Sequence, residues 1–152
     1  MEDQLLEIKT RIKILKAAPV VFEAIADPEK MSNYFISQGS GRLEAGKEIT
    51  WKFPEFDMTF PVRVDRVVQD QYLSFYWDVD GKPLLVEISL APLKDSTVVT
   101  VTEKSMPADQ AGLNWLKGNT EGWANFLACL KAYVEYGINL RTGAFDFPRE
   151  ET

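Results

Sequence analysis

The sequence predicts an α+β domain in which an antiparallel β-sheet is covered by one long C-terminal helix. Two observations support this fold class. Between residues 42 and 103, short stretches of alternating apolar and polar residues are separated by turns, as in half-buried strands. From Trp123 onward, apolar residues recur at helical spacing on one face. Strands joined by tight turns pair antiparallel, and this helix is the only predicted element long enough to cover their apolar face.

Ahead of this block, the chain predicts one strand and two short helices. Uncharged and charged residues alternate over residues 6–14, which is the period of a half-buried strand. Pro19 suits the first turn of a helix because its missing N–H costs nothing there, so residues 20–26 are expected to be helical. A second short helix is expected over residues 28–34, and a loop over residues 37–41.

Six strands are expected to follow, and turn residues divide them. Ala45-Gly46-Lys47 predicts a hairpin, Asp80-Gly81 favours a two-residue type I′ hairpin, and Lys94-Asp95-Ser96 predicts another turn. Strand parity then assigns nine side chains to the face toward the helix, namely Ile49, Trp51, Phe53, Phe75, Trp77, Val86, Ile88, Val99 and Val101.

The long helix is expected over residues 118–140, with Asn119 or Thr120 as its N-cap. Residues 106–118 are expected to form an irregular or partly helical link. The apolar stripe of the helix places five side chains against the sheet, namely Trp123, Phe126, Leu127, Leu130 and Val134. The order is therefore strand, two short helices, six strands and a long helix.

Composition bounds the class of protein. The chain has 152 residues, 45% of them hydrophobic, which suits one globular domain over residues 1–143 and a tail over residues 144–152. A net charge of −6 argues against nucleic acid or an anionic membrane as the main partner. No apolar run approaches the length of a membrane span. A single cysteine and an acidic N-terminus lead us to expect a cytoplasmic protein.

The chain contains no histidine, which excludes Ser-His and Cys-His nucleophile pairs and the commonest ligand of transition metals. We therefore expect no metal and no cofactor, and we assign no catalytic residue. Cys129 has no cationic neighbour at helical spacing and is expected to be an inert thiol. Asp78 and Asp80 flank Val79 just before Gly81, but the remaining ligands of a calcium loop are missing, so a hairpin turn is the better interpretation.

Several segments together resemble a known family, and they occur over residues 8–140. They are Ile12-Lys13-Ile14, Ala18-Pro19-Val20-Val21-Phe22-Glu23-Ala24-Ile25 and Asp27-Pro28 near the start, Gly46 before Trp51, Leu73-Ser74-Phe75-Tyr76-Trp77 and Thr97-Val98-Val99-Thr100-Val101-Thr102 in the middle, and Gly122-Trp123, Leu127, Leu130-Lys131-Ala132-Tyr133 and Gly137 near the end. Their order and spacing resemble the activator-of-Hsp90-ATPase-like family of the START/Bet v 1-like helix-grip superfamily.

The resemblance implies a curved antiparallel sheet that grips the C-terminal helix, often with an apolar cavity between them. Members of the superfamily bind lipids, steroids and other hydrophobic molecules, and some are polyketide cyclases. Eukaryotic Hsp90 activators carry such a domain beside a second, N-terminal one, for which 152 residues leave no room. The resemblance supplies no shared catalytic motif.

The candidate ligand-binding residues are the inward-facing side chains, because aromatic-rich linings with few polar groups are typical of pockets for apolar molecules. For any one of them the alternative is a place in a close-packed core, which is the commoner role. The candidates are Tyr34, Trp51, Phe53, Phe75, Trp77, Val86, Ile88, Val99, Val101, Glu103, Trp123, Phe126, Leu127 and Leu130. Phe35 could close one end beside Tyr34.

Glu103 is the sharpest single candidate. It shares parity with Val99 and Val101, so its carboxylate faces inward if the strand runs that far, where it could act as a general acid or a ligand anchor. The alternative, which we favour, is that the strand ends at Thr102 and Glu103 lies at a solvated rim.

Three hypotheses of function follow. The favoured one is non-enzymatic binding of a small hydrophobic molecule between the sheet and the helix. The second is a cyclase or lyase in which a cavity carboxylate or a tyrosine moves a proton. The third is a protein-interaction module with a chaperone-type partner, related to the Hsp90 activators. The lack of histidine favours binding over catalysis, because general acid–base work at neutral pH uses histidine most often.

Overall fold

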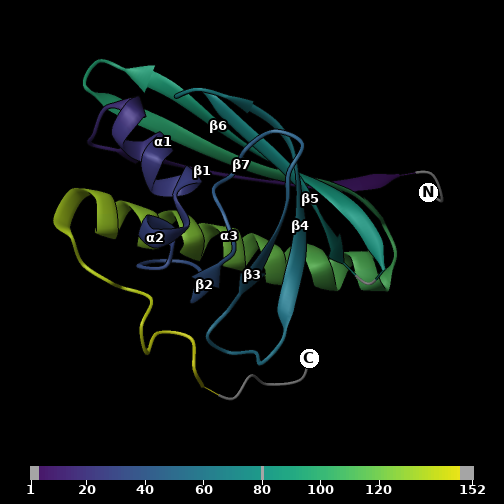
Figure 1. The fold of residues 1–152 in the computed structure, drawn as a ribbon. Helices are drawn as coiled ribbons and strands as arrows, with labels where there is room; N and C mark the ends of the chain where they lie inside the picture. Colours follow the sequence, from purple (N-terminus) through teal and green to yellow (C-terminus); the bar gives the residue numbers. More distant parts are fainter. Residues whose placement is uncertain (1–3, 80, 148–152) are drawn as a thin grey trace.

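A seven-stranded antiparallel sheet curves over one long helix in the computed structural model, which describes residues 4–79 and 81–147 (Figure 1). The strands lie in the order β1-β7-β6-β5-β4-β3-β2. Their bounds are β1 Leu5–Ile14, β2 Gln38–Gly39, β3 Glu48–Lys52, β4 Thr59–Val68, β5 Tyr72–Val79, β6 Lys82–Leu93 and β7 Ser96–Pro107, and the helices are α1 Ala18–Ala26, α2 Pro28–Met31 and α3 Gln110–Tyr136. The predicted fold class is confirmed.

The first strand and the two short helices follow the sequence pattern. Along β1, Ile8 and Ile14 are buried, whereas the charged residues between them are exposed. The Asp27 side chain caps α2 by accepting a hydrogen bond from the Glu29 N–H at 2.9 Å. The prediction that α2 extends to residue 34 was wrong. The helix ends at Met31, where Ser32 donates its hydroxyl to the Glu29 carbonyl at 2.7 Å, a side-chain bond of the kind that competes with helical structure.

The loop predicted over residues 37–41 contains the short strand β2, which pairs with β3 through Gln38↔Lys52 and Gly39↔Trp51. Polar and glycine-rich residues gave no sign of this pairing, which is imposed by tertiary packing. A Cβ at position 39 would lie 2.9 Å from the Ile36 Cδ1 atom and 3.0 Å from the Pro28 Cβ atom, so a larger residue here would require these neighbours to shift. Residues 42–47 are not a strand either, although Leu43 is buried.

Both ends of the long helix differ from the prediction. Helix α3 begins at Gln110 rather than at residue 118, and its N-cap is Asp109, which accepts a hydrogen bond from the Gly112 N–H at 2.8 Å. It ends at Tyr136 rather than at residue 140, because Gly137 adopts the left-handed conformation with φ 67°. The predicted link over residues 106–118 is therefore the end of β7 followed, from Gln110, by about two and a half turns of helix.

Strand parity is confirmed by burial. Seven of the nine side chains assigned to the inner face are buried, and Phe53 and Trp77 are partly buried. The helix adds Trp123, Phe126, Leu127 and Leu130 as buried residues and Val134 as a partly buried one. Asp80, part of the predicted hairpin turn, lies outside the described residues, and Val79 pairs with Lys82 on either side of that turn. The core therefore fills the space between the sheet and α3, except at the end described next.

Candidate functional site

Glu103 is fully buried, with 0% of its surface exposed, and the prediction that it lies at a solvated rim was wrong. Strand β7 continues four residues past it, to Pro107. At this position β7 is paired on both sides, with Ile8 of β1 and Val86 of β6 opposite Glu103. Two neighbouring strands hold the backbone in register, so the carboxylate points into the space between the sheet and α3.

Three side-chain N–H groups donate hydrogen bonds to the buried carboxylate. Trp77 Nε1 donates to Oε2 at 2.8 Å, and Trp123 Nε1 donates to Oε1 at 2.8 Å. Asn119 Nδ2 donates to Oε1 at 3.0 Å. The partners come from β5 and α3, so Glu103 joins the sheet to the helix. In the described part of the chain, no lysine or arginine forms an ion pair with Glu103.

The three donors also line a cleft of about 500 Å³, which we call the aromatic cleft. Trp77 and Trp123 form one wall, with ring centroids 5.4 Å apart, and Phe35 lies 5.9 Å from Trp123. Phe53 lies 5.1 Å from Phe35 and carries the aromatic surface toward the β3–β4 loop. The full lining is Phe35, Phe53, Glu55, Phe56, Phe60, Trp77, Asp78, Val79, Asn119, Gly122, Trp123 and Arg141.

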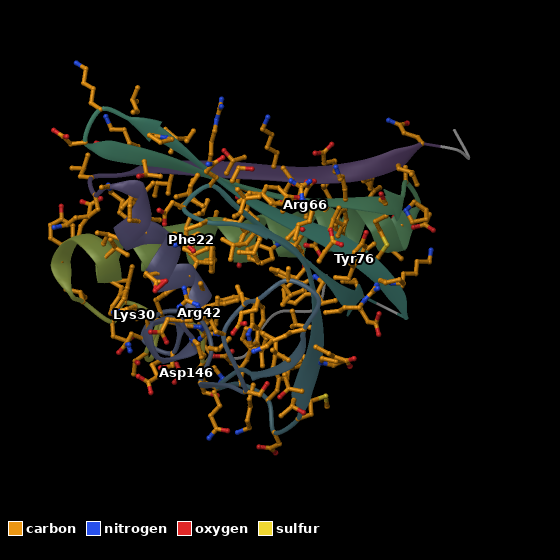
Figure 2. The ribbon with its side chains drawn as sticks, turned by 45° about the horizontal axis from the view of Figure 1, so that its top comes forward. Phe22, Lys30, Arg42, Arg66, Tyr76 and Asp146 are labelled. Atoms are coloured by element: carbon orange, nitrogen blue, oxygen red, sulfur yellow. The ribbon has the colours of Figure 1, made fainter. Side chains whose placement is uncertain are left out.

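A second cleft, of about 660 Å³, adjoins the first, and we call it the C-terminal cleft. It shares Phe35, Phe56 and Asn119 with the aromatic cleft and is closed on its other side by residues that include Phe145 and Asp146. In Figure 1 the yellow C-terminal segment turns back from the end of α3 toward the β3–β4 loop. Figure 2 shows Asp146, in this segment, well apart from Arg66 and Tyr76 on the sheet.

An ion pair joins the C-terminal segment to the β3–β4 loop where the two clefts meet. Arg141 binds Glu55 in a bidentate manner, with Nη1 donating to Oε2 at 2.8 Å and Nη2 to Oε1 at 2.9 Å. Both residues line both clefts. The Arg141 guanidinium also lies 5.5 Å from the ring centroid of Phe145. The positive charge of Arg141 is therefore directed at Glu55 rather than into the aromatic cleft.

A family model for the Activator of Hsp90 ATPase homolog 1-like proteins matches residues 17–135, most of the chain. This chain belongs to that family. The predicted family is thus confirmed. A comparison with curated protein sequences finds no match.

Solved structures support the same assignment. Protein SSP2350 from Staphylococcus saprophyticus is 33% identical and superposes with a TM-score of 0.79, covering 90% of this chain and 96% of that protein. The Aha1 dimer from Colwellia psychrerythraea is 17% identical with a TM-score of 0.76, covering 87% and 98%. DynU16, a protein in the dynemicin biosynthetic locus, is 22% identical with a TM-score of 0.78, covering 88% of this chain and 48% of that one. The last two show the shared fold.

The candidate site residues fall into two groups in this family fold. Five line the two clefts, namely Tyr34, Phe53, Trp77, Trp123 and Phe126. Eight belong to the buried core and are not part of either lining, namely Trp51, Phe75, Val86, Ile88, Val99, Val101, Leu127 and Leu130. Glu103 lies beneath the aromatic cleft and holds three of its lining residues. Whether these positions contact a ligand stays a prediction.

Sequence reasoning missed several cleft residues. Asn119 precedes Trp123 by one helical turn, so the same helical spacing that identified Trp123 would have placed it on the inner face. It was assigned instead to a cap, because the start of α3 was placed too late. Phe56 lies in the β3–β4 loop and Phe60 is the second residue of β4, where no regular alternation identifies them. The pairing of Arg141 with Glu55 spans 86 residues, and no local pattern announces it.

Two further groups bear on the chemistry. The Tyr34 hydroxyl donates to the Ala24 carbonyl at 2.8 Å, and burial, with a contribution from Tyr133, raises its pKa well above the usual value. The pKa of the Cys129 thiol is also raised by burial, although Arg141 opposes the shift. Both groups therefore stay protonated at neutral pH. Of the helices in the described part of the chain, none combines the length and apolar character needed to cross a membrane.

Proposed function

We propose that this protein binds a small, mostly apolar molecule in the aromatic cleft and does not transform it. The observation that carries the proposal is the wall of the cleft, in which six aromatic side chains surround a space of about 500 Å³. That volume falls within the range of about 300–1,000 Å³ that is usual for small-molecule pockets. A few polar groups at the floor and rim, among them Asn119, are available to orient the ligand.

The hydrogen bonds of Glu103 support binding rather than catalysis. Its two oxygens accept three N–H groups, and Glu103 is not part of the cleft lining. A ligand in the cleft would contact the indole rings and the Asn119 amide, and these separate it from the carboxylate. Tyr34 has its proton engaged by a backbone carbonyl. Neither candidate for proton transfer is therefore presented to a ligand in the aromatic cleft.

Membership of the family supports the proposal at a coarser level. Members of the superfamily with this fold often bind hydrophobic ligands. DynU16, which shares the fold, comes from a biosynthetic locus. Aromatic polyketides therefore belong in a ligand screen, beside sterols and fatty acids. Cytoplasmic location stays a prediction.

The proposal is tested by titrating the protein with that panel while tryptophan fluorescence and the melting temperature are recorded. We expect at least one class to change the fluorescence in a saturable way and to raise the melting temperature by mass action. If no class gives either signal, the proposal fails and the hypothesis of a protein-interaction module with a chaperone-type partner replaces it.

Matched tryptophan variants locate the site. Trp77→Phe and Trp123→Phe remove lining surface and an N–H, so we expect ligand affinity to fall roughly threefold to tenfold. Trp51→Phe is the control, because Trp51 is buried behind the cleft, 6.3 Å from Trp77 between ring centroids, and does not line it. A larger loss of affinity in Trp51→Phe than in the other two would place the site elsewhere.

A further inference from the structure

The floor of the aromatic cleft rests on a buried negative group. Glu103 is 0% exposed, and the partners that hold it are two indoles and one amide, all of them neutral. All three donate, which is the arrangement an acceptor-only carboxylate requires. Hydrogen bonds from neutral groups satisfy the oxygens but bring no opposing full charge. Among the described residues, no lysine or arginine lies within ion-pair distance of Glu103.

The indole rings that line the cleft are polarised by this contact. The face of an aromatic ring carries negative electrostatic potential, and tryptophan has the strongest such face. An indole whose N–H donates to a carboxylate gains further electron density in the ring. Trp77 and Trp123 both make this bond, each at 2.8 Å, and their rings are 5.4 Å apart. Phe35 and Phe53 extend the surface with further ring faces and edges.

The charged residues at the rim of the cleft also favour a negative electrostatic potential. The charged residues of the lining are Glu55, Asp78 and Arg141. Arg141 is held by Glu55 in a bidentate pair, so these two charges largely cancel. Asp78 is exposed at the rim. With Glu103 beneath the floor, the balance around the cleft is negative, and positive charge inside it would be stabilised by ring faces and carboxylates together.

We infer that the aromatic cleft selects apolar organic cations, such as quaternary ammonium or protonated amine compounds, with the cationic group against the indoles of Trp77 and Trp123. This inference rests on the proposed function and narrows it to one class of ligand. The rings supply contact area to the apolar body, and the carboxylate behind them supplies the preference for positive charge. A carboxylate group on a ligand would instead be repelled by Glu103 at the floor of the cleft.

The test compares two compounds of one shape and an anion built on the same ring system. Naphthylmethyl-trimethylammonium is the cation, neopentylnaphthalene is its uncharged carbon isostere, and naphthylacetate is the anion. Binding to the full-length protein is measured by titration calorimetry and by the indole N–H signals in ¹H–¹⁵N spectra. We expect the cation to bind about tenfold more tightly than the uncharged isostere, the range of a partly desolvated cation–π contact. The anion is expected to bind most weakly.

Two variants test whether the preference for the cation comes from Glu103 and the indoles that it contacts. Glu103→Gln keeps the approximate shape of the side chain and removes its charge, so the ratio between the affinities for the cation and for the isostere should fall to about twofold or less. Since Glu103→Gln could perturb folding, Trp77→Phe is the second variant. It keeps a ring at the partly buried position 77 and removes the N–H that Glu103 polarises, and the ratio should fall severalfold. Trp51→Phe, which retains both polarised indoles, should preserve it.

The outcomes separate this inference from the proposed function. Equal binding of the cation and the uncharged isostere, or tighter binding of the anion, would overturn the cation selectivity and leave the proposed function standing. Failure of all three compounds, when a sterol, fatty acid or polyketide binds, would have the same meaning. Failure of these compounds and of the whole panel would overturn both. Retention of the full ratio in both Glu103→Gln and Trp77→Phe would show that another group selects the charge.

Discussion

The space between β7 and α3 is built in two different ways along its length. At one end, Val99 and Val101 of the strand and Leu127 and Leu130 of the helix are fully or almost fully buried and wholly apolar. One step further along the strand lies Glu103, and one turn back along the helix lies Trp123, which donates to it. The same two elements therefore make a close-packed core at one end and a hydrogen-bonded aromatic cleft at the other.

The two ends of this space are expected to contribute differently to the stability and to the function of the protein. Replacing a buried polar network by well-packed apolar residues is often neutral or stabilising, so stability alone does not explain a glutamate at position 103. Its network does fix the rings of Trp77 and Trp123 and the Asn119 amide at the floor of the cleft. We therefore expect the apolar end to hold the domain together, and we propose that the Glu103 end shapes a binding site.

The largest expected effect concerns the apolar end. Leu130→Ala should lower the free energy of unfolding by roughly 2–5 kcal/mol, since it removes a large, fully buried side chain from a packed core. Ile138→Ala is the control, because Ile138 is 51% exposed just beyond the helix and should change stability by less than about 0.5 kcal/mol. Urea unfolding measures both. A loss below about 1 kcal/mol for Leu130→Ala would contradict the assigned helix face.

The next effect concerns the Glu103 end. Glu103→Gln replaces one acceptor oxygen with an N–H₂ group that faces an indole or amide donor, so we expect a loss of about 1–3 kcal/mol in urea unfolding. The indole N–H signals of Trp77 and Trp123 should move in the ¹H–¹⁵N spectrum, whereas that of Trp115 should not. Unchanged stability together with unchanged indole signals would mean that the three hydrogen bonds do not form in solution.

How much of the structure could be predicted from the sequence depends on how far apart in the chain the interacting residues lie. Alternation placed Trp51, Val86 and Val101 on the inner face correctly, because period-two patterns are local. Strand parity placed Glu103 on the inner face, but its burial could not be predicted, since the pairing of β7 with both β1 and β6 at that position is not a local property. The features that the sequence did not reveal depend on contacts between residues far apart in the chain. The pair of Arg141 with Glu55 joins segments 86 residues apart.

A smaller effect is expected from the ion pair between the clefts. Arg141→Gln should lower the free energy of unfolding by about 1 kcal/mol or less, because both partners are only partly buried and solvent screens the pair. It should also shift the backbone amide signals of the β3–β4 loop, and Lys47→Gln, which removes the exposed pair with Glu44, is the control for a general loss of charge. Amide signals of the loop that respond equally to both changes would show that Arg141 does not anchor the loop.

The smallest expected effect concerns Glu87, a carboxylate on the outer face of the sheet, in contrast to Glu103 on the inner face. Hydrogen bonds from Tyr72 and then Lys104 lower the pKa of Glu87 below the 4.5 of an unperturbed glutamate. A lowered folded-state pKa contributes stability that is present above pH 4.5 and is lost as the pH falls through the folded-state value. Glu87→Gln should therefore cost less than about 1 kcal/mol at pH 7 and should flatten the acid limb of the stability curve. An unchanged acid limb would contradict this.

The central claim is that ligand binds at the Glu103 end of the space and not within the apolar core. The most direct measurement follows the four indole N–H signals of uniformly ¹⁵N-labelled protein as the tightest-binding compound of the panel is added, with the signals assigned by single Trp→Phe variants. We predict saturable shifts of the Trp77 and Trp123 signals, with those of Trp51 and Trp115 nearly unchanged, because only the first two line the aromatic cleft. Saturable shifts confined to Trp51 or Trp115 would contradict the account.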